Sequence, residues 1–147
     1  MIDRKFIGAE GPLRSIEVEK YPIRFFALAI GETNPIHSDE AAAKAAGYAS
    51  LVAPPTFVSC LSSMAADPST SLFQRMNIPM ERVLHGEQNF TYHRPVVAGD
   101  VLTFRSKVAD IYEKKNGALE FIVNETTISN QRDEHVADMS FVLIVRN

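Results

Sequence analysis

One stretch decides the fold of this chain: Phe57-Val58-Ser59-Cys60-Leu61-Ser62-Ser63-Met64-Ala65-Ala66. It consists of apolar and small residues and carries no charge on any side. A helix of this kind is typical of a position buried all round. Thr56 is placed to cap its start, and Asp67-Pro68 ends it. Because only strand-like segments follow, the sequence predicts an α+β domain in which an antiparallel sheet of about five to seven strands wraps around this helix.

The C-terminal half supplies the strands, since its side chains alternate with the period of two that is typical of a half-buried strand. Four strands are predicted, at residues 84–93, 101–112, 119–129 and 135–145. Residues 115–118, Lys-Asn-Gly-Ala, predict a tight hairpin. The side chains expected on the apolar face of each strand are Gln88, Phe90 and Tyr92, then Leu102, Phe104 and Val108, then Leu119, Phe121 and Val123, and last Ala137, Met139, Phe141, Leu143 and Val145.

The N-terminal third predicts a first strand at residues 13–19 and a helix that begins near Pro22 and ends at Gly31. Ile23, Phe26, Ala27 and Ile30 are expected to share one face of this helix. A second, short helix is predicted at residues 39–46, with Ser38 as its N-cap and Gly47 as its stop.

Between these helices lies Ile30-Gly31-Glu32-Thr33-Asn34-Pro35-Ile36-His37. Glu32 and His37 are five residues apart, the wrong interval for one face of a helix, and Pro35 disfavours helical backbone at Asn34. A loop held between two helices can turn both side chains toward one point, where they could bind a water and move its protons. The alternative is an ordinary solvated loop. Asn34 is expected to stabilise its own turn.

Composition excludes several classes of protein. The chain has 147 residues, enough for a single domain spanning 1–147, with 46% apolar and 22% charged residues. A net charge of −3 gives no basic face for nucleic acid, and no apolar run approaches the roughly 20 residues of a membrane span. The first residues lack the apolar core of a signal peptide. Cys60 is the sole cysteine, so an internal disulfide is excluded, and a reducing compartment such as the cytoplasm is expected.

Other candidate groups have plainer interpretations. Without a cysteine cluster or a helical pair of histidines, no metal site is predicted. His85, His93 and His135 are expected at the surface or in an interface, and Cys60 as a small core residue. Residues 69–82, which are rich in Met and other apolar residues, are interpreted as a flap over the mouth of a pocket, or equally as an ordered surface crossover.

Three groups of residues resemble a known family. They are Gly31-Glu32-Thr33-Asn34-Pro35-Ile36-His37, then Ala45-Ala46-Gly47-Tyr48 with Leu51-Val52-Ala53-Pro54-Pro55-Thr56-Phe57, and last His85-Gly86-Glu87-Gln88-Asn89-Phe90-Thr91-Tyr92 with Arg94-Pro95-Val96-Val97-Ala98-Gly99-Asp100. Together they resemble the MaoC-like acyl dehydratases, which include the (R)-specific enoyl-CoA hydratases of hot-dog fold. The similarity is strongest to the dehydratase N-terminal-domain subgroup and covers nearly the whole chain.

The resemblance implies a set of site residues. Glu32 and His37 would be the catalytic acid–base pair, in either assignment of the two roles, while Asn34, Thr56 and Ser63 would contact substrate or support those that do. Glu32 stands where the active hydratases usually have Asp. Pro54 and Pro55 stand where they often have His-Gly, and Pro has no N–H. A donor to the thioester oxygen is therefore expected from a neighbour such as Thr56.

The resemblance also implies an activity and a partner. The activity is reversible hydration of a trans-2-enoyl thioester to an (R)-3-hydroxyacyl thioester, carried by coenzyme A or by an acyl carrier protein, without a further cofactor. One hot-dog domain leaves a sheet edge exposed, so a homodimer or a heterodimer with a second hot-dog subunit is expected. Three alternatives remain open: a non-catalytic acyl-binding partner subunit of a heterodimeric dehydratase, a hot-dog thioesterase, and a plain acyl-binding module.

Overall fold

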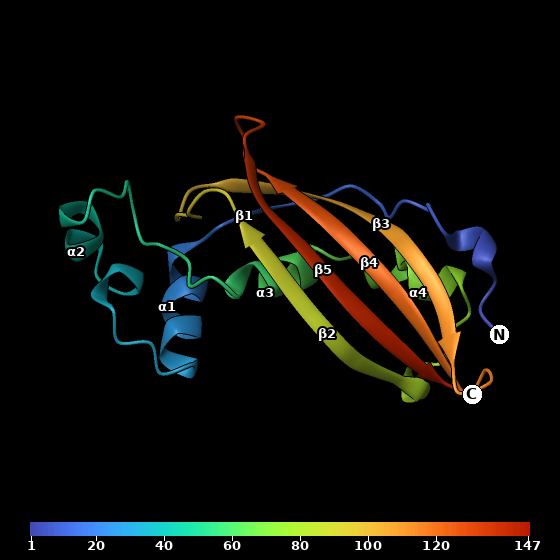
Figure 1. Cartoon of the computed structure of the whole chain (residues 1–147). Coiled ribbons are helices and arrows are strands. Elements are labelled where there is room, and N and C mark those ends of the chain that lie inside the picture. The colour runs from blue at the N-terminus through green and yellow to red at the C-terminus, as the bar shows by residue number, and fades with distance from the viewer.

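The protein is built on one five-stranded antiparallel sheet with the strand order β1-β3-β4-β5-β2 (Figure 1). The structure is a computed structural model of residues 1–147, and it describes every residue except the side chains of Leu72 and Phe73. The strands are β1 (Arg14–Glu17), β2 (Val83–Tyr92), β3 (Val101–Lys114), β4 (Leu119–Ser129) and β5 (His135–Arg146). The four strands predicted after residue 83 are therefore confirmed, with ends that differ by at most two residues.

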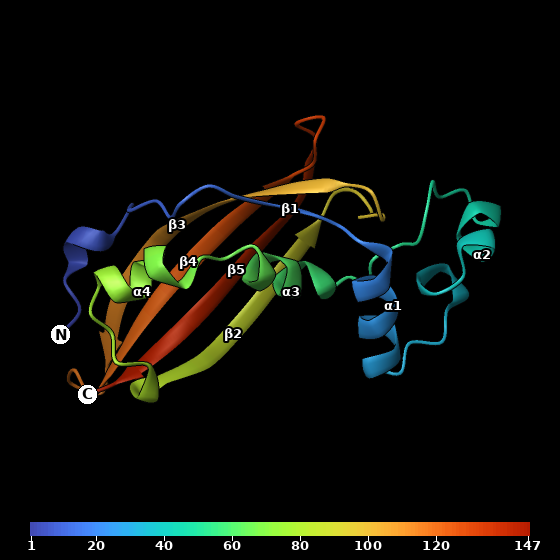
Figure 2. The same ribbon diagram turned by 180° about the vertical axis from the view of Figure 1, so that it is seen from behind.

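The helices lie on one face of this sheet and beyond one of its ends. They are α1 (Lys20–Ala29), α2 (Glu40–Ala45), α3 (Phe57–Met64) and α4 (Leu72–Arg75), and short 3₁₀ turns occur at Arg4–Phe6, Pro35–His37, Pro68–Thr70 and Met80–Arg82. Figure 2 shows α3 and α4 in front of the sheet, on the face that Figure 1 hides, with α1 and α2 past the sheet's end. The predicted α+β class, with a helix against an antiparallel sheet, is confirmed.

The main core forms where α3 meets the sheet. Phe57, Val58 and Leu61 are at most 3% exposed and pack in one cluster with sheet residues such as Phe104 and Ile128. Burial on all sides was nevertheless a wrong prediction for this helix. Ser63 is exposed and Met64 is 55% exposed, because the sheet of a single chain covers one side of α3 only.

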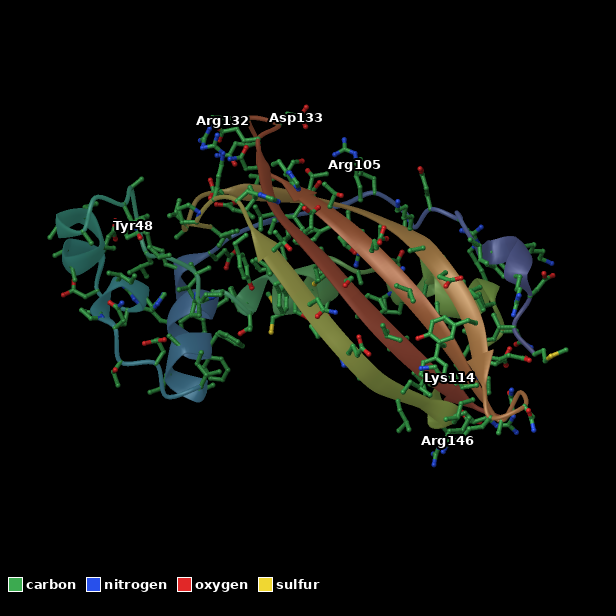
Figure 3. All side chains as sticks on the ribbon, in the orientation of Figure 1. Tyr48, Arg105, Lys114, Arg132, Asp133 and Arg146 are labelled. Atoms are coloured by element: carbon green, nitrogen blue, oxygen red, sulfur yellow. The ribbon has the colours of Figure 1, made fainter. Side chains whose placement is uncertain are left out.

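The apolar faces were predicted correctly for β2, β3 and β5 but not for β4. The inner face of β4 is formed by Ile122, Asn124, Thr126 and Ile128, so Leu119, Phe121 and Val123 lie on the outer face. Phe121 is nearly buried there because Tyr112 stacks on it, with ring centroids 4.8 Å apart, and because Lys114 (labelled in Figure 3) places its Nζ 4.9 Å from the Phe121 ring. Since both faces of β4 carry apolar residues, alternation alone could not choose between them.

Within residues 69–82, Met76 and Ile78 pack onto the sheet. Ile78 is 8% exposed and belongs to a second core cluster with Val108, Ile111, Ile122 and Val145, against which Met76 also packs. The flap interpretation is therefore wrong for this part of the segment, and the side chains of Leu72 and Phe73 lie outside the described residues.

Within the described residues, the structure contains no helix that has both the length and the apolar character of a membrane span.

Candidate acid–base site

The position of Glu32 is set by the way α1 ends. Gly31 adopts a left-handed backbone with φ +71°, and its N–H donates to the carbonyl of Leu28 at 3.1 Å. The Glu32 N–H donates to the carbonyl of Ala27 at 2.9 Å. These two bonds form a Schellman motif, the common ending of a helix at a glycine. The backbone of Glu32 is therefore tied to the last turn of α1 and does not belong to a free loop.

Replacing Gly31 with Ala tests this anchoring. Nothing lies within 4 Å of an added Cβ, so the cost comes from the left-handed backbone alone. We expect the free energy of unfolding in urea to fall by about 1 kcal/mol. Gly31→Asn should lose less, because Asn tolerates this backbone better. Equal stability of Gly31→Ala and the unmodified protein would contradict this account of the helix end.

The side chain of Glu32 folds back onto its own loop. Its Oε1 accepts a hydrogen bond from the Asn34 N–H at 2.9 Å, and Asn34 Oδ1 accepts in turn from the Ile36 N–H at 3.2 Å. The Asn34 N–H is the main cause that holds the pKa of the Glu32 carboxyl below its ordinary value. Burial opposes this lowering of the pKa, while the Thr33 N–H and the charge of His37 add to it. Glu32 is therefore an ionised carboxylate at neutral pH.

The imidazole of His37 is buried and oriented by the backbone. It is 6% exposed, and its Nδ1 lies 2.7 Å from the carbonyl oxygen of Val52. Because a carbonyl only accepts, Nδ1 must carry the proton of this bond. In neutral His37 the other nitrogen, Nε2, then has a free lone pair and can take a proton from a bound water.

The loop is also fixed at its C-terminal end, where α2 begins. Asp39, not the predicted Ser38, caps α2, and its side chain accepts from the Ala41 N–H at 2.8 Å. Asp39 is the cap because Ser38 still closes the preceding 3₁₀ turn, where its N–H donates to the carbonyl of Pro35 at 3.1 Å. α2 ends in a second glycine motif at Gly47, with φ +93°. The loop thus lies between two fixed helix ends.

Glu32 and His37 line one cavity of about 620 Å³. Its walls come from the loop itself, from the entry to α3 and from the chain that follows β2. The lining residues are Glu32, Ile36, His37, Val52, Ala53, Pro54, Pro55, Val58, Tyr92, His93, Arg94, Pro95 and Val96. Two groups able to accept a proton therefore face a mostly apolar space at the start of α3.

The other predicted site residues are placed differently. Asn34 stabilises its turn, as described above. Thr56 lies at the start of α3 with helical backbone and makes no side-chain capping bond, so the predicted cap is wrong, although Pro55 and Val58 on either side line the cavity. Ser63 donates to the carbonyl of Ser59 at 3.1 Å and lines a separate cavity of about 320 Å³. It lies more than one helical turn beyond Val58, so the structure does not bring it to the acid–base pair.

The third wall of the cavity was missed from the sequence. Tyr92, His93 and Arg94 line it, and burial raises the pKa of the Tyr92 hydroxyl. His93 was expected at the surface or in an interface, and it is indeed exposed, but its place in the cavity wall was not predicted. The available signal was its place at the end of a predicted strand, where a chain leaves the sheet and can turn toward a neighbouring helix.

Comparison with known proteins agrees with this architecture. Residues 5–139 match a family model described as FAS1-like, dehydratase domain region. A UPF0336 protein of Thermobifida fusca (strain YX) is 39% identical over 151 residues, which cover 99% of this chain and 94% of that protein.

Two solved structures extend the comparison. The C-terminally truncated HadBC (3R-hydroxyacyl-ACP dehydratase) complex of Mycobacterium tuberculosis contains a chain with a TM-score of 0.81 and 27% identity, covering 95% of this chain and 96% of that one. An (R)-hydratase from A. caviae involved in PHA biosynthesis has a TM-score of 0.71 at 20% identity, covering 93% and 94%, and supports the fold alone. The predicted resemblance to MaoC-like dehydratases is confirmed, and the chain belongs to the family described as FAS1-like, dehydratase domain region, with the hot-dog fold.

Proposed function

We propose that the protein catalyses the reversible hydration of a trans-2-enoyl thioester to an (R)-3-hydroxyacyl thioester. The observation that carries this proposal is the pair of proton acceptors in one cavity. Glu32 is ionised, and His37, whose Nδ1–H donates to the Val52 carbonyl, has an unprotonated Nε2 in its neutral form. Both residues line the same cavity. One water between them can donate a hydrogen bond to each group, which leaves a lone pair of its oxygen free to attack C3 of the substrate.

The tautomer of His37 suggests how the two roles are divided. His37 Nε2 takes a proton from the water as the oxygen–C3 bond forms, and the electron pair of the double bond moves to give an enolate with its charge on the thioester oxygen. The resulting imidazolium then delivers a proton to C2. Glu32 orients the water and stabilises the imidazolium. The Thr56 N–H at the start of α3 is our candidate donor to the thioester oxygen, since Pro54 and Pro55 have none and the Phe57 N–H donates to Pro54.

The decisive experiment is the hydration of crotonyl-CoA by the purified protein alone. We expect the absorbance of the conjugated enoyl thioester to fall and a 3-hydroxyacyl-CoA of R configuration to accumulate. Release of free coenzyme A instead of the hydroxyacyl product would identify a thioesterase. Absence of any turnover, with crotonyl-CoA and with an enoyl thioester of acyl carrier protein, would contradict the proposal for the isolated chain.

A second candidate is an acyl-binding subunit whose partner carries the catalytic groups. The likeness to one chain of the HadBC complex favours this second candidate, because the name HadBC describes that dehydratase as a complex of two subunits. Retention of an acid and a histidine in one cavity argues against it. The two proposals differ in one result: a pure binding subunit would be inactive alone and would support full activity of its partner even after Glu32 is replaced.

Two features of the surface support a second hot-dog subunit. β2 pairs only with β5, so one side of this long strand remains an open sheet edge. The outer side of α1 exposes three large apolar side chains, between 62% and 78% exposed, which are Tyr21, Phe25 and Leu28. Ile30, which lies beyond the end of α1, is also 51% exposed, although it was expected to share a face with the buried Ile23. Contiguous apolar surface of this kind usually marks an interface.

We therefore expect light scattering to find a dimer at micromolar concentration, with a buried area of about 1,600 Å² in total. Leu28→Glu should weaken the dimer at least about tenfold, the effect of losing one interface contact worth about 1.4 kcal/mol. Leu13→Glu is the matched control, because Leu13 is 64% exposed and lies outside α1. A stable monomer, or an equal effect of the two substitutions, would contradict this interface.

A further inference from the structure

A β-bulge in β5 brings His135 and Asp138 to the same face of the sheet. Ile128 pairs with Ala137 and Ser129 pairs with His135, so Val136 is an extra residue without a partner in β4. Val136 and Ala137 are 1% and 0% exposed, which means that both face the core. On a regular strand, residues three apart point to opposite faces, but the bulge shifts the alternation by one. The side chains of His135 and Asp138 therefore meet on the outside.

His93 completes a cluster with these two residues. It follows the end of β2, where its N–H donates to the carbonyl of Val136 at 2.8 Å. The Nε2 of His93 lies 3.0 Å from Asp138 Oδ2, and the Nε2 of His135 lies 3.0 Å from Asp138 Oδ1. The two imidazole rings are 4.1 Å apart between centroids, and all the ligand atoms lie within 4.8 Å of one another. Each of the two imidazoles thus contacts the Asp138 carboxylate through its own Nε2 atom.

This arrangement has the dimensions of a metal site. Zinc takes His nitrogen and carboxylate oxygen at about 2.0–2.2 Å in tetrahedral sites, which places neighbouring ligand atoms about 3.3 Å apart. The observed nitrogen–oxygen separations of 3.0 Å come within a small side-chain rotation of that value. Imidazole nitrogens with one carboxylate suit zinc and its neighbours among the divalent transition ions, whereas calcium and magnesium prefer oxygen ligands alone.

We propose that His93, His135 and Asp138 form a binding site for one divalent transition-metal ion of the zinc type. Without the ion, each Nε2 carries the proton that it donates to the carboxylate, because a carboxylate only accepts. On binding, each Nε2 gives its lone pair to the ion, and its proton either moves to Nδ1 or leaves to solvent. Three protein ligands leave a fourth position open to water or another donor.

The ion would join the wall of the acid–base cavity to the sheet. His93 lines that cavity, while His135 and Asp138 belong to β5 in the body of the sheet. A metal bond here would fix the chain that leaves β2 at the point where it forms the cavity wall. This inference does not depend on the proposed reaction, and it departs from the expectation that no metal site exists. That expectation considered cysteine clusters and helical histidine pairs, neither of which describes ligands carried by a bulged strand.

Calorimetric titration of the full chain with ZnCl₂, and absorption spectroscopy with Co²⁺, test the site directly. We expect one ion per chain in the unmodified protein. His135→Ala and Asp138→Asn should each lower the affinity about 100-fold or more, since even residues that only support a ligand are worth 10–100-fold. His85→Ala is the matched control: His85 is an exposed histidine on β2 that contacts Gln88 and Phe141, outside the cluster, and its loss should leave binding unchanged.

Nitrogen NMR of the unmodified protein gives a readout that needs no substitution. The Nε2 atoms of His93 and His135 should each lose their proton when Zn²⁺ is added, while His85 should not change. Urea unfolding of each variant without metal checks that it is folded. The proposal is overturned if the unmodified protein fails to bind Zn²⁺ or Co²⁺, if His135→Ala binds as tightly, if His85→Ala loses binding equally, or if both Nε2 atoms keep their protons.

Discussion

Replacing Glu32 with Gln is expected to lower the turnover of enoyl-thioester hydration by roughly 10² to 10⁴, the usual contribution of a positioned acid or base. The amide oxygen of Gln can still accept the hydrogen bond that the Asn34 N–H makes at 2.9 Å, so the loop should keep its shape. The substitution removes the negative charge that, in the proposed mechanism, orients the water and stabilises the His37 imidazolium. Steady-state rates with crotonyl-CoA measure the loss.

Further variants at this pair distinguish an enzyme from a binding subunit. His37→Ala should reduce turnover to a similar degree, and the double variant should add little, because both groups act on one water. Glu32→Asp should also be slower, since the shorter side chain cannot both accept from Asn34 and reach the same point in the cavity. Wild-type rates in both Glu32→Gln and His37→Ala would falsify the assignment of this site and leave the binding-subunit proposal standing.

Leu61→Ala is expected to lower the free energy of unfolding by about 3–5 kcal/mol, the range for a buried leucine that leaves a cavity. Leu61 is 1% exposed on α3, in the main core cluster between the helix and the sheet. The loss is a large share of the roughly 5–15 kcal/mol that stabilises a domain. Urea unfolding monitored by circular dichroism gives the value.

Leu13→Ala is the control for this prediction, because it removes the same atoms from a side chain that is 64% exposed. Its effect should stay within about 0.5 kcal/mol. Similar losses in the two variants would mean that the contact between α3 and the sheet is not the main source of stability.

Much of the fold could be predicted because the patterns that indicate it each lie within one short stretch of sequence. The uncharged stretch from Phe57 and the period of two after residue 83 indicated a helix against an antiparallel sheet, which the structure contains. The errors arose where a residue's surroundings decide its burial. Met64 is apolar yet 55% exposed, because one chain covers only one side of α3. Phe121 is nearly buried on the outer face by Tyr112, a contact that alternation along a single strand cannot indicate.

Only the part of the candidate site that lies within one short stretch of sequence could be predicted. Glu32 and His37 were identified because one short loop carries both, and Gly31 and Pro35 indicated its shape. The wall formed by Tyr92 and its successors comes from a distant segment, so no spacing could indicate it. The bulge that joins His135 to Asp138 leaves no mark in the sequence either, since Val136 and Ala137 are ordinary strand residues.

The open edge of β2 has a consequence for the energetics of assembly. The strand continues at its last residue, Tyr92, directly into the wall of the acid–base cavity. A subunit that paired along β2 would therefore act on the same piece of backbone that a ligand in this cavity would contact. Association and ligand binding then share one coupling free energy, and linkage requires this coupling to be reciprocal. If pairing tightened ligand binding tenfold, about 1.4 kcal/mol, the ligand would tighten the pairing by the same factor.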